Sequence, residues 1–150
     1  MSTPEDDAAR ALAEAVGQGM YARDRASQHL GLELEEIGPG FARMRMRVLE
    51  HMVNGHDLCH GGLIFCLADS AFAFACNSYN DVTVAAGSSI EFLRPAVLGE
   101  TLIATACEQT RGKRTGIYDV RVQAADGRLI ALFRGRSSTV GGQVIPTMKA

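Results

Sequence analysis

The sequence predicts an α+β fold in which a long, curved antiparallel sheet surrounds a single, very apolar helix. The first observation is that residues 61–78 are apolar on every side, and a helix without a polar face is normally buried all round. The second is that strand-like segments with short turns between them follow this helix, which is typical of an antiparallel meander. A sheet must twist and curl strongly to cover such a helix. One chain can hardly do this alone, so the sequence also implies a second subunit.

The composition is that of one packed domain. Of the 150 residues, 47% are apolar and 21% are charged, which excludes a disordered chain. We expect a single domain over residues 1–150, with its core at about 27–142. The chain end from Gly141 reads as a frayed tail, with residues 143–150 flexible and outside the core.

The net charge, the cysteines and the first residues of the sequence argue against several classes of protein. A net charge of -2 argues against a general nucleic-acid binder, which usually carries a clear basic excess. The four cysteines form no CxxC pair and read as small hydrophobic residues in a reduced, cytoplasmic protein. Residues 1–7 are polar and acidic, unlike a secretory signal. The apolar run 61–76 is only 16 residues long and contains Asp69, so we expect no membrane span.

The remaining elements follow from local patterns. Residues 4–26 read as a helix, because Pro4 suits a first helical turn, acidic residues follow it, and apolar residues repeat every four positions. Residues 31–37 and 41–49 read as strands joined by the turn at 38–40, and in the second strand arginines alternate with apolar residues. Further strands are expected over residues 82–92, 101–108, 115–123 and 128–140.

Asp69 lies about two turns inside the apolar helix and is the only carboxylate between Asp57 and Asp81. An ionised aspartate is almost never fully buried without a partner. Asp69 therefore meets a donor or a cavity, or it marks a functional site. In a purely structural reading, neighbouring backbone, Ser70 or Asn77 would satisfy its carboxylate.

The residues around Asp69 form a longer motif. Residues 54–69 read NGHDLCHGGLIFCLAD and residues 70–78 read SAFAFACNS. Downstream, IEFLRP at 90–95, TGIYDV at 115–120 and ALFRG at 131–135 follow in order. Together these segments resemble the hot-dog-fold thioesterases, and most closely the branch that acts in phenylacetic acid degradation. The resemblance covers roughly residues 20–142.

This resemblance implies a hot-dog fold with an extra N-terminal helix, and an acyl-CoA thioesterase that hydrolyses phenylacetyl-CoA or hydroxyphenylacetyl-CoA. It makes Asp69 the catalytic nucleophile or general base, the Gly61 N–H the oxyanion donor, and Asn54 the residue that holds water or the thioester oxygen. The chemistry agrees, because the first N–H groups of a helix lack intrahelical partners and carry the positive end of its dipole. The residues expected to bind the substrate are His60, Gly62, Phe65, Arg94, Lys113, Arg114 and Thr115.

Several of these residues have another reading. The basic side chains could hold the CoA phosphates or form an ordinary solvated surface, and Phe65 could line an aryl pocket or the core. His60 reads by itself as a structural residue that bonds backbone at the loop–helix junction. A metal site at residues 51–60 is disfavoured because its histidines straddle a loop, and a nucleophilic Cys59 or Cys66 has no evident base. We expect neither a metal nor a cofactor.

Two further function classes stay open on the fold alone. Hot-dog domains also act as acyl-thioester dehydratases or hydratases, and as non-catalytic acyl-CoA-binding proteins. A dehydratase usually pairs a histidine with a carboxylate, and His60 with Asp69 is the nearby candidate pair. Release of free thiol from an acyl-CoA would separate hydrolysis from the other two.

The spacing of Gly61 and Asp69 also predicts an assembly. Eight residues separate them, which is about 12 Å along a helix. A thioester carbonyl needs both groups within roughly 3 Å. Two antiparallel copies can meet this demand, with Gly61 of one facing Asp69 of the other. We therefore expect a homodimer with shared active sites, assembled further into a homotetramer.

Overall fold

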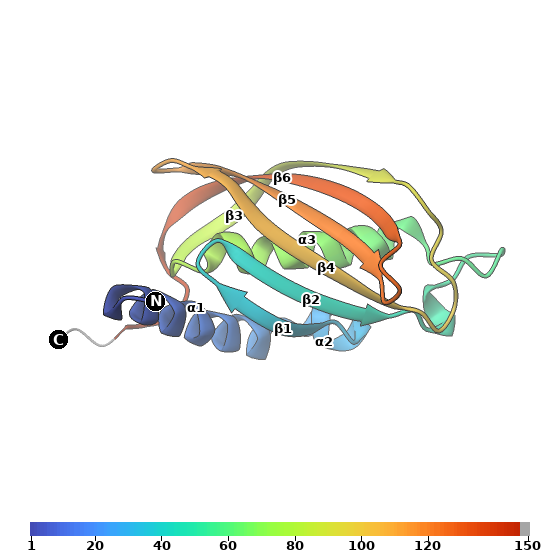
Figure 1. Cartoon of the computed structure of the whole chain (residues 1–150), viewed down its shortest axis with the longest axis horizontal. Helices are drawn as coiled ribbons and strands as arrows, with labels where there is room; N and C mark the ends of the chain where they lie inside the picture. Colours follow the sequence, from blue (N-terminus) through green and yellow to red (C-terminus); the bar gives the residue numbers. More distant parts are fainter. Residues whose placement is uncertain (148–150) are drawn as a thin grey trace.

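Six strands form one antiparallel sheet that curls around a central helix in the computed structural model, which describes residues 1–147 (Figure 1). The chain runs through α1 (Pro4–Arg23), α2 (Arg25–Leu30), β1 (Glu33–Gly38), β2 (Phe41–Arg47), the short 3-10 helix η1 (Glu50–Met52), α3 (Gly61–Asn77), β3 (Asp81–Phe92), β4 (Thr101–Arg111), β5 (Thr115–Ala124) and β6 (Leu129–Gln143). The predicted α+β class with an extra N-terminal helix is confirmed. No helix in residues 1–147 has the length and apolarity needed to cross a membrane.

The sheet has the order β1-β2-β4-β5-β6-β3, and every neighbouring pair is antiparallel. Strands β4, β5 and β6 form the meander that the sequence predicted. The strand that follows the central helix, β3, is not part of that meander, because it pairs only with β6 and lies at the edge of the sheet. The sheet order therefore leaves the outer side of a 12-residue strand without a partner among residues 1–147.

The first predicted helix is interrupted. The expected helix over 4–26 is wrong beyond Arg23, because Asp24 ends α1 and caps α2. The Asp24 carboxylate accepts from the N–H of Ser27 at 2.9 Å and from its hydroxyl at 2.5 Å. At the other end, Thr3 and Asp6 form a reciprocal capping box, which stabilises the start of α1.

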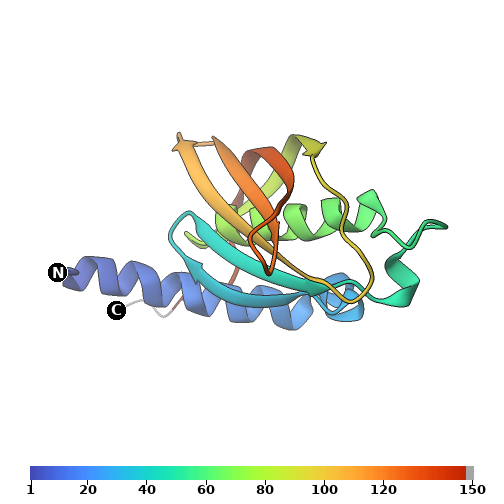
Figure 2. The same ribbon diagram turned by 45° about the vertical axis from the view of Figure 1, so that its right-hand side comes forward.

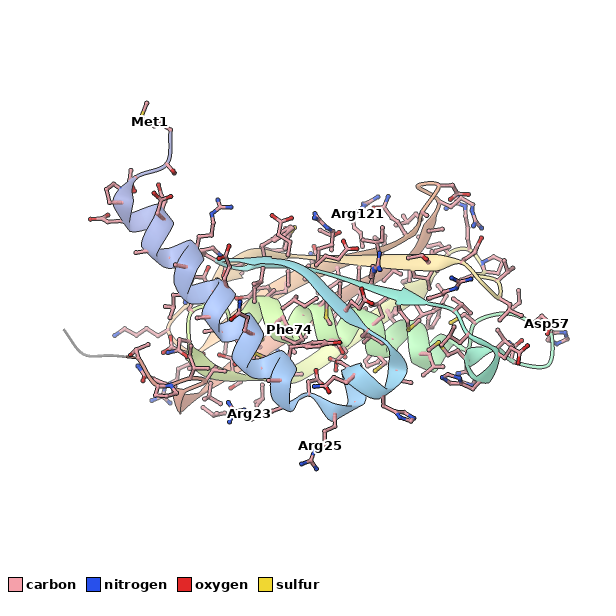
Figure 3. The ribbon with its side chains drawn as sticks, turned by 90° about the horizontal axis from the view of Figure 1, so that it is seen from below. Met1, Arg23, Arg25, Asp57, Phe74 and Arg121 are labelled. Carbon is pink, nitrogen blue, oxygen red and sulfur yellow. The ribbon has the colours of Figure 1, made fainter. Side chains whose placement is uncertain are left out.

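Helix α3 lies in the concavity of the sheet, as Figure 2 shows. The ring of Phe72 packs against Tyr118 and Phe133, with centroids 5.6 and 5.8 Å away. Gly135 of β6 lies against the Phe72 ring. A Cβ at position 135 would lie 2.7 Å from this ring, so only glycine fits there. Helix α1 crosses the underside next to β1 and reaches Phe74 through Tyr21, at 6.5 Å between centroids (Figure 3).

One face of α3 is left uncovered by the part of the chain that the structure describes. Gly62 is exposed, and Cys66, Asp69 and Ala73 are partly exposed, at the spacing of a single helical face. The expectation that one chain can hardly bury this helix on all sides is therefore met.

The chain end is more ordered than the sequence predicted. The expected frayed tail from Gly141 is wrong as far as Ile145, because β6 continues to Gln143 and the next two residues are bonded to Asn80 and Arg23. The Asn80 side chain accepts from the Ile145 N–H at 2.8 Å and donates to the Ile145 carbonyl at 3.0 Å. Arg23 of α1 donates to the Val144 carbonyl at 3.0 Å. Residues 148–150 of that predicted tail lie outside the described residues.

Candidate active site

The start of α3 leaves one backbone donor free. His60 is the N-cap, and its Nδ1 accepts from the Gly62 N–H at 3.0 Å. The His60 carbonyl accepts from Leu63 at 2.9 Å and from Ile64 at 3.3 Å. Among residues 1–147, none accepts a hydrogen bond from the Gly61 N–H. A single N–H at the positive end of an apolar helix is thus available to an external oxygen.

His60 holds this arrangement through its side chain. Because Nδ1 accepts a hydrogen bond, this nitrogen carries no proton, and the ring N–H is the one at Nε2. The predicted backbone-bonding role at the loop–helix junction is confirmed by this contact. A dehydratase pair with Asp69 is not formed within the chain, since nine helical residues separate the two, or about 13 Å.

Asn54 supplies a second donor to the groove that Gly61 lines. Its Oδ1 accepts from the N–H of His56 at 2.9 Å and of Leu58 at 3.2 Å, which fixes the side chain in the loop before α3. No hydrogen bond from its Nδ2 to another described residue is present. Asn54 and Gly61 line the same groove of about 310 Å³. The structure therefore brings together two of the three predicted catalytic residues.

Asp69 lies elsewhere on α3. It does not line that groove, and its carboxylate is half-buried on the open face of the helix. Burial raises the pKa of Asp69 above its ordinary value of 3.8, with no neighbouring charge or hydrogen bond to offset the cost. The alternative in which Ser70 or Asn77 satisfies the carboxylate is not what the structure shows, since Asn77 bonds Ala73 and Thr83 instead.

The predicted substrate-binding residues fall into separate places. Arg94 lines the groove at Gly61 and donates to the Leu129 carbonyl at 3.1 Å. Phe65 packs edge-on against Phe133, with centroids 5.4 Å apart, as the core reading proposed.

Lys113, Arg114 and Thr115 lie at the other end of the molecule. Lys113 and Arg114 belong to the turn after β4, and Thr115 begins β5. Lys113 and Thr115 line a small polar hollow with Cys76 at the C-terminal end of α3. Figure 1 shows this turn at the end of the sheet away from the start of α3. Since α3 has 17 residues, the two ends are about 25 Å apart. Within one chain these three residues do not meet Gly61.

Two other chemistries were considered for these residues, a metal site and a cysteine nucleophile. In residues 1–147 no group of three or more His, Cys, Asp or Glu side chains is placed to hold a metal ion. Burial raises the pKa of the Cys59 thiol to about 11, which makes it a poor nucleophile. Burial also raises the pKa of Cys66.

Sequence reasoning missed one side chain of this site. Phe92, at the end of β3, covers Gly61 with its ring and lines the groove. The signal was present, because Phe92 belongs to the matched segment IEFLRP, but only the fold brings the end of an edge strand to the start of a helix.

Comparison with known proteins agrees with this arrangement. Residues 56–131 match the family model described as the thioesterase superfamily. The chain is 45% identical to acyl-coenzyme A thioesterase PaaI of Escherichia coli (strain K12), over 83% of this chain and 89% of that protein. The structure of the E. coli PaaI protein from the phenylacetic acid degradation operon matches with a TM-score of 0.88 and 42% identity, covering 89% of this chain and 97% of that one.

A second solved structure gives the same result. It is a mutant of the phenylacetic acid degradation protein PaaI from Thermus thermophilus, with a TM-score of 0.75 and 34% identity over 78% of this chain and all of that one. The motif, the hot-dog architecture and these similarities point the same way: this chain belongs to the thioesterase superfamily.

Proposed function

We propose that this protein is an acyl-CoA thioesterase that hydrolyses aryl-acyl-CoA thioesters, of the phenylacetyl-CoA or hydroxyphenylacetyl-CoA type, in the cytoplasmic degradation of phenylacetate. The observation that carries the proposal is the pair of free donors, the Gly61 N–H and the Asn54 amide, on one groove. It is supported by 45% identity to acyl-coenzyme A thioesterase PaaI of E. coli.

The two donors suit the difficult step of the reaction. When a nucleophile adds to the thioester carbon, negative charge develops on the carbonyl oxygen, and donors fixed in advance stabilise it. The C–S bond then breaks and the CoA thiolate leaves. Asp69 either takes the proton of the attacking water, or itself attacks to give an anhydride that water then hydrolyses. Both routes give the free acid and CoA.

The active site is proposed to lie between two copies of the chain. Asp69 is about 12 Å along the helix from Gly61, too far for both to reach one carbonyl. The unpaired edge of β3 and the open face of α3 are the surfaces on which a second copy would pack. Antiparallel pairing about a two-fold axis would place the Asp69 of one copy beside the Gly61 of the other.

The same pairing would bring the separated substrate residues together. The segment with Lys113, Arg114 and Thr115 lies at the opposite end of α3 from Gly61, so an antiparallel partner would offer it to the neighbouring groove. There its basic side chains could bind the CoA phosphates. Two such dimers are proposed to form a homotetramer.

Thiol release from a panel of acyl-CoA substrates tests the activity. Phenylacetyl-CoA and its hydroxylated relatives should be hydrolysed with higher kcat/KM than aliphatic acyl-CoA substrates. Asp69→Asn should keep the fold and lose about a hundredfold or more of the rate, as when a general base is removed. Substrate that binds to the wild-type protein without releasing thiol would identify a non-catalytic binding protein instead.

Mixing two defects tests the shared site. Gly61→Pro removes the free N–H, and the extended backbone of His60 (φ -60, ψ 132) accepts a following proline. Each homodimer, Gly61→Pro or Asp69→Asn, should be almost inactive. A co-refolded equal mixture should regain roughly a quarter of wild-type activity, because half of the dimers are mixed and each has one intact site. If each active site lay within one chain, every site would carry a defect and the mixture would regain no activity. The oligomeric state of Gly61→Pro is checked first, since its ring approaches Phe92.

A further inference from the structure

The ring of Phe92 lies directly against the start of α3. A Cβ placed on Gly61 would meet three carbons of this ring at 3.1, 3.4 and 3.5 Å. Phe92 is nevertheless 52% exposed, so its ring is not part of the core. The backbone beyond it is held separately, by the Leu93 N–H that donates to the Ile130 carbonyl at 2.8 Å. Packing within the chain therefore does not account for an aromatic side chain at this position.

The same ring forms one wall of the groove that contains the two free donors. The rest of the lining is largely apolar, and consists of Leu58, Cys59, Ile64, Leu93, Pro95 and Ala96 beside Asn54, Gly61 and Arg94. Its volume of about 310 Å³ is at the small end of ligand pockets.

Beyond the two free donors, which the proposed mechanism assigns to the thioester oxygen, this groove offers a polar chain few partners. The Asn54 Oδ1 is taken by two backbone N–H groups, and the Arg94 guanidinium donates to a backbone carbonyl. A pantetheine arm carries two amides that would lose hydrogen bonds against such a wall. An aromatic acyl group loses none, and a ring face is available for it to stack on.

Resting on the thioesterase function proposed above, we propose that Phe92 is a specificity-determining residue. Its ring stacks on the aryl ring of the acyl group, while the thioester carbonyl accepts from the Gly61 N–H beside it. The groove therefore takes the acyl half of the substrate and leaves the CoA half outside. Glycine at 61 serves both roles, since it exposes the donor and makes room for the ring.

The test is a ratio of substrates. We measure kcat/KM for phenylacetyl-CoA and for acetyl-CoA, which has no ring to stack, in wild type, Phe92→Ala, Phe92→Leu and Phe92→Tyr. Stacking of two rings is worth about three- to tenfold in an equilibrium. The ratio of phenylacetyl-CoA to acetyl-CoA should fall about tenfold in Phe92→Ala, nearly as much in Phe92→Leu, and little in Phe92→Tyr.

Leu98→Ala is the matched control. Leu98 is a similarly exposed apolar residue on the segment after β3, at 44% exposure, and does not line the groove. The ratio of kcat/KM for phenylacetyl-CoA to that for acetyl-CoA should be the same in Leu98→Ala as in wild type. If Phe92→Ala or Phe92→Leu lowered kcat/KM for both substrates equally, Phe92 would only support the helix start or contact the pantetheine arm, and the proposal would be wrong. A wild-type protein that hydrolyses neither substrate would refute the thioesterase function itself, which is a separate result.

Discussion

The Asp69 carboxylate combines a functional role with an energetic cost. It is half-buried, and burial alone raises its pKa above 3.8. Only the ionised form can attack a carbonyl or accept a proton from water. We therefore expect the acidic limb of the kcat/KM profile to lie above pH 3.8, because the carboxylate becomes protonated at a higher pH than an exposed aspartate. Steady-state rates across the acidic range check this, and a limb at or below that value would contradict it.

The same shift predicts a stability difference. Since the folded-state pKa of Asp69 lies above the unfolded value, the native state holds the proton more tightly, and stability falls as pH rises between the two values. Asp69→Asn should therefore raise Tm at neutral pH, and the gain should vanish below pH 3.8. Thermal unfolding of both proteins over pH measures it. Asp81→Asn, at an exposed position, is the control, and an equal gain there would remove Asp69 as the cause.

Asn54 and Asp69 should differ in the size of their effect. Asn54→Ala removes a donor that positions or stabilises, whereas Asp69→Asn removes the reacting group. We expect a loss of about ten- to a hundredfold for Asn54→Ala, smaller than that for Asp69→Asn. Single-turnover rates on a saturating substrate separate the two. A folded Asn54→Ala protein with the larger loss would reverse the assigned roles.

At the residue scale, the sequence was informative where a rule of local chemistry applied. The glycine pair at the helix start and the buried carboxylate both stand out against their neighbours, and the N-cap role of His60 follows from its place before them. The contact between Phe92 and Gly61 joins residues 31 positions apart, and no local rule predicts it. The sequence also did not predict that the basic residues on the turn after β4 lie near the C-terminal end of α3, away from Gly61.

Among the elements, the strands were predicted more closely than the first helix. Alternation placed Met44 and Met46 inside, and the arginines of β2 outside, where Arg43 and Arg45 pair with glutamates of β1. The break in the first helix was missed because no glycine or proline marks it in the sequence, and only the hydrogen bonds of the Asp24 side chain show that a new helix begins. Pairing of β3 with β6 was also beyond the sequence, which carries no information on order within a sheet.

The edge strand β3 gives a prediction of its own. Its middle, including Ser88, is exposed on an unpaired edge, which is where a second copy is proposed to bind. Ser88→Lys should raise the Kd of the dimer about tenfold, because the two-fold axis brings like charges together. Sedimentation at a series of concentrations measures this. Ala11→Lys, on the exposed face of α1, is the control. An unchanged Kd for Ser88→Lys would place the interface elsewhere.

On the scale of the whole molecule, the last described residues close the fold. Asn80 adopts a left-handed backbone conformation (φ 71), and its side chain bonds both polar backbone groups of Ile145. Ile145 in turn packs against Gly19 of α1, where a Cβ would approach it to 2.5 Å. The predicted tail failed here because two glycines end the strand pattern in the sequence, and the side chain that holds the segment lies 65 positions earlier.

Asn80→Gly isolates this attachment. Glycine accepts the same backbone conformation, so only the two side-chain hydrogen bonds are lost, at about 1–3 kcal/mol of unfolding free energy. Denaturant unfolding measures the loss. Removing residues 144–150 should have a similar or larger effect, and adding Asn80→Gly to that shortened chain should change little further. Full additivity of the two changes would mean that Asn80 stabilises the fold by some other contact.

The order of the strands has a consequence for how the chain folds while it is being synthesised. Helix α3 leaves the ribosome before β4, β5 and β6, the strands that cover it, and β3 emerges long before β6, the strand with which it pairs. Before β6 begins at Leu129, the nascent chain contains the apolar helix α3 without its full cover and the strand β3 without a partner on either edge. Such segments are where aggregation begins and where chaperones bind. We therefore expect the sheet to close late, once β6 has been synthesised, rather than stepwise from the N-terminus.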